Sequence, residues 1–282
     1  MNKILIVLAA SLFLFSCQKE ISFPTSPSGT PGATGTLLIR AVQKAGSDSA
    51  VAVFTYDVNK RLIRESVSGL LSGVDLTSDL QIKRNSSGII TQIIIKSPGL
   101  SQAGIDSIVR TVYYDINNKR YSGTTVPLDI GSGYEAVDST AFVYSGNKVI
   151  EEDEYGVIHS PHFEELAAKV VYEYNGAFNN ITARHQFYTD SSLNLIASTD
   201  YNYTYDNKTN PLKLSGEAFV LSQALFFNAN NQISILQKDL TGVSPAITTN
   251  NTYQYNSLNL PVSLISVSTP GNDTETTSYY YK

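Results

Sequence analysis

One stretch decides the fold: Phe54-Thr55-Tyr56-Asp57-Val58-Asn59-Lys60-Arg61-Leu62. It holds two aromatic side chains two positions apart, followed by an acid, a short polar run and then the first apolar residue of the next segment. The pattern returns at Phe142-x-Tyr144-Ser145, Tyr172-x-Tyr174-Asn175, Tyr203-x-Tyr205-Asp206 and Tyr253-x-Tyr255-Asn256, with looser copies at Arg84-Asn85, Tyr113-Tyr114-Asp115 and Phe226-Phe227-Asn228. Most copies lie about 30 residues apart, which indicates a repeated supersecondary unit.

Each copy has the chemistry of a β-hairpin. Aromatic side chains at i and i+2 fall on one face of a strand, where they pack well. The Asp or Asn that follows caps a tight turn by accepting backbone N–H groups, and Gly or Asn supplies the left-handed position, as in Asn85-Ser86-Ser87-Gly88. An apolar outgoing strand such as 89–95 completes the hairpin.

About eight such hairpins predict an all-β fold, an antiparallel up-and-down meander of roughly 16 strands built as a single domain over residues 36–282. A sheet with that many twisted strands curls strongly or closes into a large barrel. The one helical signal is Ser160–Lys169, where Ser160 suits an N-cap, Pro161 the first turn, and Glu164 and Glu165 the positive end of the helix dipole. At most one short helix is expected, and it would lie there.

The composition suits a sheet protein, with 18 tyrosines, no tryptophan and 16% charged residues. The formal net charge is −5, and no basic run occurs anywhere in the chain. The sequence therefore contains no cluster of basic residues that would predict binding to nucleic acid or to anionic lipid.

The N-terminus predicts the compartment. Lys3 precedes an apolar stretch, Ile4–Phe15, that is too short to span a membrane and is typical of a signal peptide over residues 1–16. Leu14-Phe15-Ser16-Cys17 resembles the lipobox of bacterial lipoproteins, which implies that Cys17, the only cysteine in the chain, becomes the lipid-modified N-terminus. Residues 17–35, rich in Pro, Gly and Ser, are expected to form a flexible tether.

The repeat itself carries a second resemblance. Tyr56-Asp57-Val58-Asn59-Lys60-Arg61-Leu62 is similar to the YD repeat of Rhs-type proteins, and 205–212 and 255–261 resemble the Asn-Pro variant found in secreted lipoproteins of the Bacteroidota. Those lipoproteins include families of unknown function with a porin-like, many-stranded sheet. The resemblance implies a lipid-anchored cell-envelope protein, in the outer membrane, and implies no activity.

A search for chemistry singles out residues 151–165. Glu151, Glu152, Asp153 and Glu154 precede His159, His162, Glu164 and Glu165, a mixture from which a divalent metal site could be built. The alternative is an acidic solvated loop that leads into the expected helix, which we favour because His-x-x-His lacks a metalloprotease pattern. His185 is expected on a sheet face. No catalytic, cofactor-binding or metal residue is therefore assigned.

The recurring tyrosines have two interpretations. Exposed Tyr rings can form a platform for sugars or peptides. Because they recur at the same place in every hairpin, we favour a structural role, in which tyrosines on neighbouring strands contact one another and fix the pairing register of the sheet.

Three functions follow from these observations. The first is a lipid-anchored, non-catalytic scaffold or binding module that needs no cofactor, touches the membrane only through its N-terminal lipid, and binds an unidentified glycan, peptide or envelope protein. The alternative is an envelope enzyme that acts on polysaccharide with paired carboxylates. The third is a transmembrane porin, which is disfavoured because strands such as 61–65 place charge on both faces.

Overall fold

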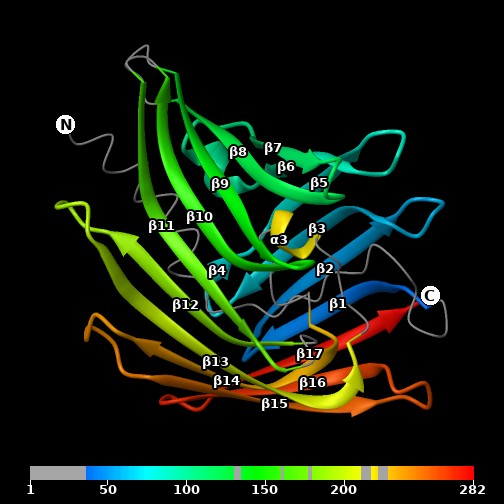
Figure 1. Ribbon diagram of the computed structural model, residues 1–282. Coiled ribbons are helices and arrows are strands. Elements are labelled where there is room, and N and C mark those ends of the chain that lie inside the picture. The colour runs from blue at the N-terminus through cyan, green and yellow to red at the C-terminus, as the bar shows by residue number, and fades with distance from the viewer. Residues whose placement is uncertain (1–35, 130–134, 160–161, 177–179, 211–216, 222–227) are drawn as a thin grey trace.

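The structure is a computed structural model that describes residues 36–129, 135–159, 162–176, 180–210, 217–221 and 228–282. The chain forms a closed antiparallel barrel of 16 strands with one additional short strand. Successive strands are neighbours around the ring, and the first strand pairs with the last (Figure 1). The predicted all-β meander and its closure are confirmed.

The strands are β1 (Leu38–Ala45), β2 (Asp48–Tyr56), β3 (Leu62–Leu71), β4 (Val74–Asp75), β5 (Ser78–Arg84), β6 (Ile90–Lys96), β7 (Ile108–Asp115), β8 (Arg120–Asp129), β9 (Glu135–Ser145), β10 (Lys148–His159), β11 (His162–Tyr174), β12 (Ile181–Thr189), β13 (Leu195–Thr209), β14 (Asn230–Asp239), β15 (Ile247–Tyr255), β16 (Pro261–Thr269) and β17 (Asp273–Tyr281). Two short helices are described, α2 (Pro98–Gln102) and α3 (Glu217–Val220). Within the described segments, no helix has the length and apolarity needed to cross a membrane.

The barrel closes where the two ends of the described chain meet. Leu37 and Lys282 exchange two backbone hydrogen bonds of 2.9 Å. β1 then pairs with β17 as far as Ala45 opposite Glu275, and β4 pairs with β3 beside the ring. A closed ring of strands leaves no edge to which another strand can add.

The two ends of the barrel are built differently. We call the end that holds the turns after Tyr56, Arg84, Tyr114, Tyr144, Tyr174, Tyr205 and Tyr255, together with Leu37 and Lys282, the base. We call the opposite end, with the connections at 46–47, 72–77, 97–107, 190–194, 240–246 and 270–272, the mouth. Alternate connections of an up-and-down barrel lie at opposite ends, so every copy of the aromatic repeat ends at the base.

Turns at the base follow the predicted chemistry. Asp57 Oδ1 accepts the backbone N–H of Asn59 at 2.8 Å and of Arg61 at 2.9 Å. Asn85 and Asn256 cap their turns in the same way. The left-handed position is occupied by the expected Gly or Asn in two turns, at Gly88 (φ 85°) and Asn259 (φ 57°). In two other turns it is occupied by a lysine, Lys60 (φ 62°) or Lys119 (φ 53°). The side-chain cap holds the turn where the backbone conformation is less favourable.

A ladder of tyrosine hydroxyls joins neighbouring hairpins at the base. Each hydroxyl donates to a carbonyl at the start of the outgoing strand of the preceding hairpin: Tyr56 to Leu38 (2.6 Å), Tyr144 to Tyr121 (2.6 Å), Tyr174 to Val149, Tyr205 to Ile181 (2.5 Å) and Tyr281 to Pro261 (2.6 Å). Arg84 stands at the tyrosine position of its unit, and its Nη2 donates to Leu62 O at 3.2 Å. The repeated aromatic residue thus holds the register of the sheet.

The helix expected over Ser160–Lys169 is wrong, because residues from His162 onward form β11. β10 and β11 pair from Glu151 opposite Val171 to His159 opposite His162. Ladder hydrogen bonds with two long neighbouring strands outweigh local helix signals, which are weak by comparison. Ser160 and Pro161 lie outside the described residues.

The sixth hairpin carries a long insertion. β13 ends at Thr209 and β14 begins at Asn230, and α3 within this link lies inside the barrel (Figure 1). Phe226 and Phe227, which looked like a further copy of the repeat, lie outside the described residues. The irregular spacing after Tyr205 therefore marks an insertion into one hairpin.

Candidate functional site in the barrel interior

Helix α3 lies inside the barrel near the base and is held there by a buried ion pair. Glu217 receives Arg84 in a bidentate contact, with Nη1–Oε1 at 2.6 Å and Nη2–Oε2 at 2.9 Å. Both side chains are less than one tenth exposed. The Tyr121 hydroxyl donates to Glu217 Oε1 at 3.3 Å and accepts the Ile90 N–H at 3.1 Å. A buried pair needs such additional hydrogen bonds to offset the loss of hydration.

Aromatic and backbone contacts complete this floor. The Phe219 ring meets Tyr172 edge-on, with centroids 5.4 Å apart, and lies 6.5 Å from Phe142. Arg110 Nη1 donates to the carbonyl of Val220 at 3.1 Å, at the negative end of the short helix. The insertion of the sixth hairpin is therefore attached to strands β5, β7, β8, β9 and β11.

Above this floor, toward the mouth, charged side chains line one side of the interior. Strand pairing places Glu152 opposite the buried Phe142, and Glu154 opposite Thr140. Paired residues share a face of the sheet, so both carboxyl groups point inward. The same alternation places Asp138 on the inner face of β9, Arg110 on that of β7 and Arg184, opposite Tyr201, on that of β12.

The interior carboxyl groups have perturbed acidity. Burial, opposed by the Tyr172 hydrogen bond and by Arg184 and Arg110, raises the pKa of Glu152 to about 7. Burial, together with the charges of Asp138 and Glu152, raises the pKa of Glu154 to about 7. Burial also raises the pKa of Asp138, against the attraction of Arg110. Perturbed pKa values that arise from burial and specific charge partners are typical of functional sites.

Two observations make this cluster a candidate binding site. Glu152 Oε1 is buried, and no described residue donates a hydrogen bond to it. The charged side chains of the cluster nevertheless retain partial exposure, although they face inward. A side chain that points into the barrel and is still accessible to water must border an open space inside the barrel. Next to Arg110, the partly buried Leu80, Ile95 and Ile108 form an apolar area on the inner face of β5, β6 and β7.

The acidic run that the sequence singled out is divided between the two faces of β10. Glu152 and Glu154 point inward, whereas Glu151 and Asp153 point outward and contact Lys169 Nζ at 2.8 and 3.2 Å. The run is therefore not the acidic loop that we favoured. Strand alternation could have separated the two pairs, had the segment been recognised as a strand.

The histidines do not gather into a site. The backbones of His159 and His162 lie opposite each other across β10 and β11, while their side chains fall outside the described residues. His185 lies on the outer wall, with Nδ1 2.8 Å from Asp200 and Nε2 3.3 Å from Glu173, and the Asp200 hydrogen bond raises its pKa. No set of metal-ligating side chains suited to a cation occurs among the residues described.

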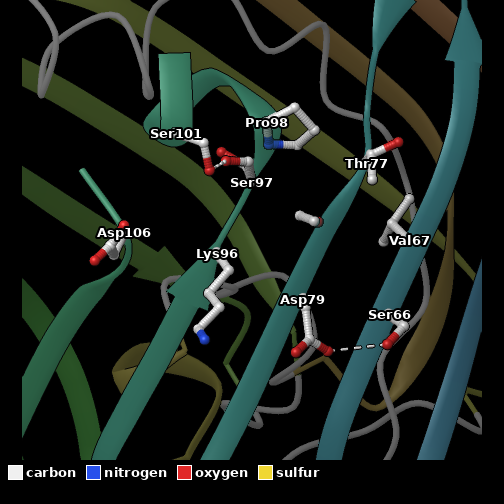
Figure 2. A pocket seen from close by; sticks show the side chains of 10 residues that line it. Ser66, Val67, Thr77, Asp79, Lys96, Ser97, Pro98, Ser101 and Asp106 are labelled. Atoms are coloured by element: carbon white, nitrogen blue, oxygen red, sulfur yellow. Dashed lines mark hydrogen bonds between the residues drawn. The ribbon is translucent and has the colours of Figure 1, made fainter. Parts of the chain in front are cut away.

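A shallow pocket lies near the mouth, between β3, β5 and α2. Figure 2 shows Asp79 bonded to Ser66, with Lys96, Ser97, Pro98 and Asp106 around it. Asp79 is also bonded to Arg64 and Gln81. Since its principal acceptor is already engaged by side chains of the outer wall, this pocket is a weaker candidate than the interior cluster.

The fold is similar to that of two porin-like proteins of Bacteroides. The protein from Bacteroides vulgatus is 14% identical, with a TM-score of 0.55 over 87% of this chain and 99% of its own. The protein from Bacteroides uniformis is 13% identical, with a TM-score of 0.54 over 91% of this chain and 100% of its own. No protein family and no curated protein sequence matches the chain. At such identities the likeness shows the fold alone.

Proposed function

We propose that this chain is a lipid-anchored envelope protein whose barrel binds a small polyhydroxylated ligand, of the sugar class, in its interior. The observation that carries the proposal is Glu152, an inward carboxylate with one buried oxygen that receives no hydrogen bond from the described residues. A buried acceptor without a donor is costly, and a ligand hydroxyl would satisfy it.

The surroundings of Glu152 supply the other groups that such a ligand requires. Carboxylates accept hydrogen bonds from hydroxyl groups, and the guanidinium groups of Arg110 and Arg184 donate them. Tyr172 and Tyr201 present aromatic surface on the same face of the sheet, and Leu80 and Ile95 add an apolar area on the inner face of β5 and β6. A largely apolar space with a few convergent polar groups is the usual character of a small-molecule site. Because α3 lies inside the base, the ligand would enter from the mouth.

The anchor in this proposal is Cys17. A lipobox-like sequence around the only cysteine supports it, as does the location of the barrel's first residues directly after the Pro- and Gly-rich segment. Mass spectrometry of the N-terminal peptide should show an acylated Cys17. The Cys17→Ser protein should remain unacylated. An unmodified cysteine in protein isolated from its native membrane would contradict the anchor.

The outer wall supports a barrel surrounded by water. Charged groups occur on the outside of β3 and β5, in the Arg64–Asp79 pair, on β10 and β11 around Lys169, and on β11–β13 around His185. A lipid-facing wall needs a continuous apolar band, and a charge at its centre costs about 2–4 kcal/mol. The wall therefore favours a tethered domain over a transmembrane porin.

A matched pair of variants tests the binding site. Isothermal titration with a panel of monosaccharides and oligosaccharides should identify a ligand for the intact protein. Glu152→Gln should weaken its affinity by roughly tenfold or more, since a hydrogen bond to a charged group contributes about 1.5–3 kcal/mol. Glu151→Gln, one residue away on the outer face, should leave it unchanged. Equal affinities for both variants, or no ligand in the panel, would refute the proposal.

A second function, polysaccharide hydrolysis, is favoured by one observation. Glu152 and Glu154 both have pKa values raised to about 7, as a general acid requires near neutral pH. Aryl glycosides of several sugars should then be hydrolysed, with a rate that Glu154→Gln abolishes. If none of these glycosides were hydrolysed although the protein bound sugar saturably, the hydrolytic function would be refuted and the binding function would stand.

A further inference from the structure

The two ends of the barrel carry opposite charge. The described connections of the base hold the basic residues Lys60, Arg61, Lys119, Arg120, Lys148 and Lys208 beside the acids Asp57, Asp115 and Asp206. The described connections of the mouth and their adjoining strand ends hold the acids Asp48, Asp75, Asp106, Asp190, Asp239 and Asp273 beside three basic residues, Lys44, Lys96 and Lys238. An overall acidic chain thus presents one basic end.

The positive charge of the base faces outward, while its acids are engaged locally. Lys60 and Lys119 occupy the exposed left-handed positions of their turns. Asp57 accepts turn amides and pairs with Arg61, and Asp115 accepts the N–H groups of Asn117 and Asn118. Carboxylates that cap their own turns leave the lysines as the outermost charges of this end.

Aliphatic side chains stand beside these lysines at the tips of the turns. Val58 is 97% exposed, Ile116 75% and Leu258 52%. Exposed aliphatic tips also occur at the mouth, where Leu193 is 65% and Val243 85% exposed, but there the neighbouring charges are acidic. Apolar residues flanked by basic ones are the combination that binds the surface of anionic membranes.

The chain also enters the barrel at this end. Leu37, which pairs with Lys282 at the base, follows Cys17 by only twenty residues. A lipid on Cys17 would therefore be joined to the barrel at its basic end.

We propose that the base of the barrel rests on the anionic headgroups of the membrane that holds the lipid anchor. Lys60 and Lys119 contact the phosphates, Val58 and Ile116 enter the interfacial layer, and the mouth opens away from the bilayer. The orientation of the barrel on the membrane depends on the proposed lipid anchor at Cys17. The affinity of the base for anionic lipid is independent of that anchor. The sequence offered no basic run, and the fold gathers scattered basic residues into one surface.

The test uses the chain from Gln18 onward, which lacks the lipid and retains every described strand. Its binding to vesicles is measured by co-sedimentation, with phosphatidylcholine alone or mixed in equal parts with phosphatidylglycerol. Binding should need the anionic lipid and weaken with added salt, which screens surface charge. The double variant Lys60→Asn, Lys119→Asn keeps residues that tolerate positive φ and should bind more than about tenfold more weakly, since each charge contributes roughly fivefold.

Controls at the mouth make the result specific. Lys44→Asn with Lys96→Asn removes the same charge near the mouth and should leave vesicle binding unchanged. Val58→Ser should reduce binding by roughly twofold to fivefold, whereas Val243→Ser should not. Equal losses from the base and mouth variants, or equal binding to the two kinds of vesicle, would overturn the proposal. Acylation of Cys17 is read separately by mass, so either conclusion can fail alone.

Discussion

The base and the mouth of this barrel differ in how closely they follow the repeat. At the base, one device recurs from hairpin to hairpin: an aromatic hydroxyl reaches the preceding hairpin, and an acid or amide caps the turn. At the mouth the connections differ in length and include a short extra strand and helix α2. The repeat therefore specifies one end of the molecule, and the other end is free to vary.

Two departures from the repeat meet inside the base. Arg84 replaces the aromatic residue of the second hairpin, and α3 lies in the insertion of the sixth. Glu217 of that insertion binds Arg84 and accepts the Tyr121 hydroxyl. Arg84, the exception to the repeat in one hairpin, thus binds the insertion of another hairpin inside the base.

The largest effect on stability is expected when the buried Arg84–Glu217 ion pair inside the base is removed. Arg84→Met leaves Glu217 as an uncompensated buried charge, and the free energy of unfolding should fall by about 3–5 kcal/mol. Chemical denaturation followed by circular dichroism measures the loss. Arg64→Met, which breaks the exposed pair with Asp79 on the outer wall, should change stability little.

A compensating variant separates charge from packing. Arg84→Met combined with Glu217→Leu removes both charges and should recover much of the lost stability, because an apolar pair can replace a buried ion pair. If the double variant were as unstable as Arg84→Met alone, shape at this position would matter more than charge.

The charged interior should make stability depend on pH. Glu152 and Glu154 have pKa values of about 7 in the folded chain against 4.5 for an ordinary glutamate. The folded state therefore binds more protons between these values, and the free energy of unfolding should decrease as pH rises from 4.5 to 7, by about 1–3 kcal/mol for each group. Glu152→Gln should flatten this slope in thermal unfolding, whereas Glu151→Gln should keep it. A wild-type curve that rises over this range would contradict the assignment.

The smallest expected effect concerns a single step of the tyrosine ladder. Tyr144→Phe removes the 2.6 Å hydrogen bond to the carbonyl of Tyr121 and should cost about 1 kcal/mol. Tyr113, on the outer wall, bonds the Thr125 hydroxyl, and Tyr113→Phe should leave the unfolding midpoint almost unchanged. Equal midpoints for the two variants would show that the ladder contributes no stability.

Most of the fold was predictable from the sequence because its signals are local and repeated. Aromatic spacing and Asp or Asn turns predicted hairpins, and their number predicted a closed sheet. The segment 160–169 was misassigned because Pro161 and two glutamates imitate a helix start, whereas pairing with β10 depends on residues elsewhere in the chain.

The candidate site was predictable only in part. Glu152 and Glu154 lie in the acidic run that attracted attention, but the division of that run between two faces follows from its being a strand. Arg110 and Arg184 carry no local signal, since they lie on other strands and act on the carboxyl groups through their charge. The partner of Arg84 lies 133 residues away, beyond any pattern of spacing.

The pairing of Leu37 with Lys282 has a consequence for biosynthesis. Until the final strand has left the ribosome, β1 has no partner on one side, and the growing sheet carries an open edge at each end. Such edges invite pairing with other chains, and contacts between distant residues form slowly. A chain that lost β17 would keep almost all of its hairpins and yet expose β1 and β16 as two unpaired edges, so even a small C-terminal deletion should produce aggregation in place of a slightly smaller barrel.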